Sequence, residues 1–118
     1  MDTPSYLRLA VTKLSREIGV RTYQDFDRLE KTVQYISGEF TAFGYQVSHQ
    51  SFKFAGNTYQ NVIAELKGRT SPEKVLVVGA HYDTVRTTPG ADDNASGVAG
   101  LLRLAKLLAG RPQDKTVR

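Results

Sequence analysis

The segment Val75–Leu102, VLVVGAHYDTVRTTPGADDNASGVAGLL, decides the fold of this 118-residue chain. Its opening apolar run belongs to a strand expected over residues 74–80. That strand is apolar on both faces, which is typical of a strand buried in a sheet covered by helices. A polar loop follows, and apolar residues at helical spacing then predict a helix over residues 95–109. Strand, loop and helix in this order indicate an α/β fold.

Two more helices are expected before this segment. Thr3-Pro4 predicts the start of the first, with the threonine as its capping residue, and Gly19 predicts its end. The second is expected to run from Asp25 to Phe43 and to stop at Gly44. Each carries apolar residues at helical spacing. These residues are Leu7, Val11, Leu14 and Ile18 in the first helix, and Leu29, Val33, Ile36, Phe40 and Phe43 in the second.

A β-hairpin is expected between the second helix and the strand at 74–80. Its arms are residues 45–54 and 58–67, joined by the turn Ala55-Gly56-Asn57. The apolar positions of the first arm change parity midway, so we expect a bulge or an edge position there. Residues 115–118 predict the beginning of another strand. The order of these elements indicates an α/β sandwich built as a single domain.

Composition excludes several classes of protein. The chain is 40% hydrophobic and 24% charged, which is a globular mixture, and it has no cysteine, which excludes a disulfide scaffold and a thiolate zinc site. The net charge of +4 comes from scattered residues, so no nucleic-acid partner is expected. No stretch is long and apolar enough for a membrane span, and the N-terminus lacks the apolar segment of a signal peptide. The compartment stays open.

Polar residues able to bind a metal ion stand at both ends of the loop between the strand and the helix. His81 and Asp83 come at the carboxyl end of the strand, where open α/β sheets bind ligands. Asp92, Asp93 and Asn94 open the helix. A neutral imidazole and a carboxylate are suitable zinc ligands, and a second carboxylate can accept the other imidazole N–H. Because neighbouring carboxylates repel each other, a bound cation would stabilise the cluster.

Each of these features also has a simpler structural interpretation. A lone His-x-Asp pair is most often a surface hydrogen bond, and Asp-Asp-Asn before a helix is most often an N-cap cluster. His49, the second histidine, has no acidic neighbour and is interpreted as a solvated histidine on a strand. The metal site is nevertheless favoured for His81, because dismissing it would require every one of these simpler interpretations to be true at once.

Two motifs, GAHYDTV at 79–85 and PGADDNASGVAGLL at 89–102, resemble those of zinc aminopeptidases with two co-catalytic metals. This metallopeptidase family includes secreted bacterial aminopeptidases, glutamate carboxypeptidases and, more distantly, glutaminyl cyclases. LSREIG at 14–19 and NVIAE at 61–65 follow the order usual in the family. The resemblance implies a three-layer αβα sandwich of the zinc-exopeptidase type, of which residues 1–118 are the N-terminal part. It also implies hydrolysis of N-terminal peptide bonds by the complete protein.

The resemblance implies roles for three residues and one backbone feature. His81 is expected to be a ligand of one zinc ion, and Asp93, rather than Asp92, the carboxylate that bridges two zinc ions. Asp83 is expected to act in catalysis by orienting His81. A cis peptide bond is expected between Asp93 and Asn94.

The family's general-base glutamate and its remaining metal ligands come later in the sequence than Arg118. The 118 residues alone are therefore expected to be inactive or nearly so. Three alternatives stay open: a non-catalytic module that binds a partner, one that self-associates through an unpaired sheet edge, and a carboxypeptidase or glutaminyl cyclase relative. Family members are often secreted or periplasmic.

Overall fold

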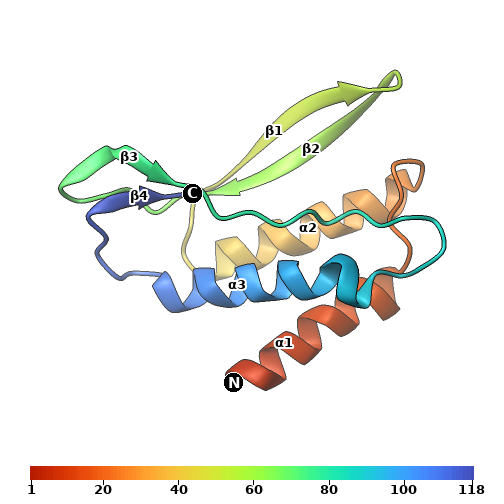
Figure 1. Cartoon of the computed structure of the whole chain (residues 1–118), viewed down its shortest axis with the longest axis horizontal. Helices are drawn as coiled ribbons and strands as arrows, with labels where there is room; N and C mark the ends of the chain where they lie inside the picture. The colour runs from red at the N-terminus through yellow and green to blue at the C-terminus, as the bar shows by residue number, and fades with distance from the viewer.

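The computed structural model describes all residues, 1–118, and confirms the α/β class. Two helical regions come first, three strands follow, and a last helix and strand end the chain; the helices lie together on one side of the strands (Figure 1). Two short segments adjoin the α-helices: η1 is π-helical, and η2 is kinked, with non-helical backbone angles at Asp93 and Asn94. The elements are α1 (Thr3–Thr12), η1 (Lys13–Ile18), α2 (Phe26–Ala42), β1 (Val47–Phe54), β2 (Asn57–Ala64), β3 (Ser71–Leu76), η2 (Ala91–Ser96), α3 (Gly97–Leu108) and β4 (Lys115–Val117). None of the helices combines the length and apolar character needed to cross a bilayer.

The first two helices begin and end close to where the sequence predicts. The capping residue of α1 is Asp2 instead of Thr3, since the Asp2 carboxylate accepts a hydrogen bond of 2.9 Å from the backbone N–H of Ser5. Gly19 and Gly44 follow the two helices with positive φ of 91° and 96°, which glycine adopts without steric cost. Both expected stops are therefore confirmed.

The hydrophobic core lies among the helices. Its buried residues come from α1, η1, α2, η2 and α3. On α1 the buried face is Tyr6 and Ala10, one residue before the expected Leu7 and Val11, which are only half-buried. The core residues are Tyr6, Ala10, Leu14, Ile18, Ile36, Phe40, Ala95, Val98, Ala99 and Leu102. Because η2 and α3 supply four of them, this core fixes the start of α3, where the acidic residues of the candidate site lie.

The β-hairpin has an unbroken register, from Val47 opposite Ala64 to Phe54 opposite Asn57. The expected bulge in the first arm is therefore wrong, although β1 is an edge strand as predicted. The loop has two residues, Ala55 and Gly56, with φ of 50° and 78°. Two-residue loops with positive φ have a twist that matches the strands they join, so no bulge is needed.

Ala55 carries a strained backbone, and replacing it should stabilise the hairpin. Left-handed φ is unfavourable for alanine but tolerated by asparagine. We expect Ala55→Asn to raise the free energy of unfolding by about 0.5–1 kcal/mol, measured by urea denaturation followed by circular dichroism. Ala55→Val should lower it, because a β-branched side chain tolerates positive φ least. Equal stabilities for the two variants would contradict this account of the loop.

The strand expected to be buried over 74–80 is exposed, and this expectation is wrong. β3 ends at Leu76, and the chain then continues as an extended segment without a regular ladder. Leu76 and Val77 are 58% and 68% exposed. A strand is buried on both faces only when helices cover both faces and strands flank it. In this structure β3 pairs with β4 alone, in parallel, and the helices lie on one side.

The strand expected at 115–118 is confirmed as β4. Its Val117 pairs with Leu76 of β3 and also forms an antiparallel bridge with Leu66, just beyond β2. The bridge has two backbone hydrogen bonds, of 2.8 and 2.9 Å, between Val117 and Leu66. β4 therefore lies between β3 and the end of the hairpin.

Candidate functional site

The three acidic and imidazole residues singled out by the sequence converge in the structure. Asp83 Oδ1 lies 3.0 Å from His81 Nδ1, and Asp93 Oδ1 lies 3.1 Å from His81 Nε2. The histidine ring thus stands between two carboxylates that are ten residues apart in the chain. All three side chains are more than half exposed, so a ligand can reach them from solvent.

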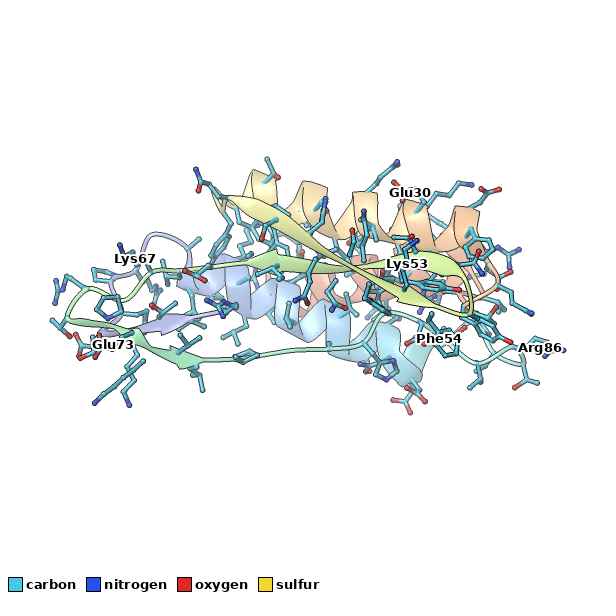
Figure 2. The ribbon with its side chains drawn as sticks, turned by 90° about the horizontal axis from the view of Figure 1, so that it is seen from above. Glu30, Lys53, Phe54, Lys67, Glu73 and Arg86 are labelled. Carbon is cyan, nitrogen blue, oxygen red and sulfur yellow. The ribbon has the colours of Figure 1, made fainter.

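The path of the chain after β3 explains this convergence. From the end marked by Glu73, the extended segment runs along the molecule to the loop that carries Arg86, at the opposite end (Figure 2). The chain then turns back and enters η2, which leads into α3 (Figure 1). His81 lies on the outgoing stretch, five positions beyond the last residue of β3, and Asp93 lies on the return.

The Asn94 side chain links these two stretches by a hydrogen bond. Its side-chain nitrogen donates a hydrogen bond of 3.2 Å to the backbone carbonyl of His81, and its side-chain oxygen accepts one of 3.2 Å from the backbone N–H of Gly97. The amide of Asn94 therefore provides a capping hydrogen bond at the start of α3, and the simpler N-cap interpretation applies to this residue. The peptide bond between Asp93 and Asn94 is cis, as the resemblance implies.

Asp92 and His49 lie outside the cluster. The backbone carbonyl of Asp92 accepts a hydrogen bond of 2.6 Å from the Ser96 hydroxyl, and its carboxylate makes no ion pair. His49 is exposed on β1, as expected, with its Nε2 2.8 Å from the Ser37 hydroxyl. The structure therefore places His81 and Asp93 in the cluster and leaves His49 and Asp92 outside it, as expected from the sequence.

The two ring nitrogens of His81 cannot both donate to a carboxylate when the imidazole is neutral, because a neutral ring has one N–H. When Nδ1 carries the proton and donates to Asp83, the lone pair at Nε2 of a neutral ring faces Asp93. In that tautomer, a metal cation between Nε2 and the Asp93 carboxylate would interact favourably with both.

The distance between His81 Nε2 and Asp93 Oδ1 fits two ligands of a zinc site. Two ligands about 2.0–2.1 Å from a tetrahedral zinc ion lie about 3.3 Å apart, close to the 3.1 Å between His81 Nε2 and Asp93 Oδ1. Structural zinc sites have four protein ligands and catalytic sites three. No group of three or more histidine, cysteine, aspartate or glutamate side chains able to hold a metal ion occurs in the structure. His81 and Asp93 alone thus provide fewer donors than either kind of zinc site requires.

The sequence analysis missed a buried arginine beside this cluster. Arg21 is fully buried, and its side chain donates hydrogen bonds to four backbone carbonyls. Nε donates to Tyr82 at 2.8 Å, and Nη1 donates to Leu14, Gly19 and Pro89 at 2.6, 2.7 and 3.0 Å. Burial lowers the pKa of the Arg21 guanidinium, and the charge of nearby Asp83 opposes that shift. Arginine is mostly exposed in proteins, so no pattern in the sequence indicates this position.

The backbone of Arg21 adds a second connection to the same loop. Its N–H donates to the Thr84 hydroxyl at 2.9 Å, and its carbonyl accepts from the Thr84 N–H at 3.0 Å. Thr84 is itself buried and directly follows Asp83. The residues on both sides of Asp83 are therefore bonded to Arg21.

The sequence of the chain is similar to those of known proteins. Residues 61–118 match the model of Peptidase family M28. The chain is 37% identical over 114 residues to the uncharacterized protein YfbL of Escherichia coli K12, covering 90% of this chain and 35% of that protein. It is 35% identical over 99 residues to a probable zinc metalloprotease of Pyricularia oryzae, covering 76% of this chain and 18% of that protein.

A solved structure shares the fold. The structure of a leucine aminopeptidase precursor from Bacteroides thetaiotaomicron matches with a TM-score of 0.78 and 25% identity, covering 98% of this chain and 44% of that one. The 118 residues thus span less than half the length of each of these proteins. From the family match and these similarities, the chain belongs to Peptidase family M28.

Proposed function

We propose that these 118 residues supply part of the zinc site of an aminopeptidase that hydrolyses N-terminal peptide bonds. The observation that carries the proposal is the His81 ring held between two carboxylates. His81 and Asp93 would hold the metal, and Asp83 would fix the ring by accepting the Nδ1 proton. Zinc, when bound, supplies Lewis-acid chemistry toward the peptide carbonyl. The aminopeptidase similarity supports this choice of activity.

The contribution of Asp83 follows from its position. By accepting from Nδ1, its carboxylate selects the tautomer with a free lone pair at Nε2. That lone pair points to the side of the ring where Asp93 lies, so both donors address the same space. Because two donors rarely hold zinc tightly, we propose that the 118 residues alone bind it weakly and have no measurable peptidase activity.

The chain's two histidines allow a matched test. We expect zinc titration of the purified chain, followed through the histidine ring resonances in NMR, to shift the His81 signals. His81→Ala should eliminate the response, while His49→Ala should leave it unchanged, since His49 lies on β1 away from the carboxylates. A response that survives in His81→Ala and disappears in His49→Ala would overturn the proposal.

A second candidate function is self-association of two copies. A groove of about 870 Å³, lined mainly by apolar side chains, lies between the hairpin, α2, α3 and the extended segment from Val77 to Asp83. The strand edges beside it have no partner, and the adjacent β3 residues are exposed. Exposed apolar strand edges pair readily with another strand, and a second copy of the chain offers the same edge.

Sedimentation measures this alternative directly. If two copies pair at this edge, the wild-type chain should sediment as a dimer at micromolar concentration and Val77→Lys as a monomer. Leu9→Lys is the matched control, because Leu9 is a similarly exposed apolar residue on α1 (56% against 68%) and does not line the groove. A wild-type chain that sediments only as a monomer excludes the alternative.

A further inference from the structure

We propose that Arg21 is a positioning residue for the candidate metal site, acting through the backbone on both sides of it. The inference rests on the proposed function for its consequence on metal binding. Its geometric part, the fixing of His81 relative to Asp93, rests only on hydrogen bonds of the chain.

The guanidinium bonds the two stretches that carry the site. Nε donates to the carbonyl of Tyr82, which lies between His81 and Asp83 in the sequence. Nη1 donates to the carbonyl of Pro89, which precedes the turn into η2 and Asp93. One rigid planar group thus bonds both the outgoing and the returning stretch, and its fork of N–H donors fixes directions as well as distances.

The same group is anchored to the end of the first helical region. Nη1 also donates to the carbonyls of Leu14, within η1, and of Gly19, directly after η1. The Leu14 carbonyl also accepts the Gly19 N–H at 3.0 Å, so the guanidinium bonds the turn that closes η1. Arg21 therefore ties the site to the buried core that begins with Leu14.

A charged group at this position is better explained by the site than by the core. Arg21 forms no ion pair, and its Nη2 has no hydrogen-bond partner although it is buried. An unpaired buried cation is costly, and an apolar side chain would fill the same space without that cost. The guanidinium instead bonds four backbone carbonyls in three segments of the chain, and Asp83 lies nearby.

Two substitutions of Arg21 separate shape from charge. Arg21→Met removes the donors, and Arg21→Lys keeps the charge but lacks the planar fork that reaches both Tyr82 and Pro89. In the wild-type chain, NMR should show nuclear Overhauser contacts between the His81 ring protons and the Asp93 side chain, as their 3.1 Å approach requires. In both variants these contacts should weaken, and amide exchange at Thr84 should be about tenfold faster or more.

Smaller variants keep the test decisive if the arginine variants fail to fold. Thr84→Val removes the hydroxyl that accepts from the Arg21 N–H and donates to the Val85 carbonyl, and it should weaken the contacts between the His81 ring and Asp93 in the same way. Thr32→Val is the matched control: Thr32 is equally buried, its hydroxyl donates to Arg28 within α2, and it should leave His81 unchanged.

The metal arm distinguishes the two proposals. If the wild-type chain binds zinc, Arg21→Lys, or Thr84→Val in its place, should weaken binding about tenfold, the range typical of residues behind metal ligands. If the wild-type chain binds no zinc, the proposed function fails, while the contact and exchange measurements still judge Arg21. A folded Arg21→Lys chain, or a Thr84→Val chain, with unchanged contacts between the His81 ring and Asp93 and unchanged Thr84 exchange would overturn the positioning role.

Discussion

Asp93→Ala is expected to abolish zinc binding by the chain, while Asp92→Ala leaves it unchanged. The Asp93 carboxylate is 3.1 Å from His81 Nε2, and that of Asp92 makes no ion pair. Removing one of two donors should lower the affinity by at least about 100-fold, the upper end of the effect of removing a supporting residue behind a ligand. Competition with a chromogenic zinc chelator measures both variants on one scale.

The adjacent position makes Asp92→Ala a close control. Both substitutions remove one negative charge from the same segment, so a general electrostatic attraction for cations would weaken equally in both. Only direct coordination separates them. Equal losses of affinity would therefore contradict the assignment of Asp93 as a ligand, and a loss confined to Asp92→Ala would reverse it.

The local patterns of the sequence predict the helices, and together with the family resemblance they predict the site cluster. Helices form from residues close in the chain, so apolar spacing and the glycines at 19 and 44 locate α1, η1 and α2 within a few residues. The cluster follows from topology. A short loop that leaves a strand and returns into a helix brings His81 and Asp93 together whatever its detailed path.

Features that depend on distant neighbours were not predictable in this way. The apolar run at 75–78 indicates burial, but burial requires covering layers on both faces, and the structure gives β3 one neighbouring strand. The parity change in the first hairpin arm indicated a bulge, whereas cross-strand contacts decide the register. Phe52 and Tyr59 stack across the hairpin with their ring centroids 5.8 Å apart. Arg21 gives no local signal, since two of the carbonyls it bonds, those of Tyr82 and Pro89, are 61 and 68 residues away.

Gly90→Ala is expected to destabilise the chain and to disturb the site, because Gly90 is where the loop turns into η2. Its backbone is left-handed, with φ of 66° and ψ of 46°. A Cβ added there would meet the side chain of Thr84 and would lie 2.5 Å from the backbone carbonyl of Asp93. Left-handed strain of about 1–2 kcal/mol and overpacking of about 1–3 kcal/mol predict a loss of about 2–5 kcal/mol.

The clash cannot be relieved by a simple side-chain movement. Thr84 is held through its hydroxyl by Arg21, and the other contact is the backbone of Asp93 itself. Relief therefore requires the segment that carries the Asp93 carboxylate to move relative to His81. We expect Gly90→Ala to weaken zinc binding as well as stability, measured by urea denaturation and by chelator competition on the variant that remains folded.

Gly100→Ala supplies the opposite expectation within the same segment of chain. Gly100 lies inside α3 with helical backbone, and an added Cβ would meet no atom within 4 Å. Alanine is the better helix former, so the free energy of unfolding should rise by up to about 1 kcal/mol. If Gly90→Ala and Gly100→Ala lost stability equally, the left-handed turn at Gly90 would not explain the loss. A loss confined to Gly90 means that the turn into η2 must be left-handed and free of a side chain for Asp93 to face His81.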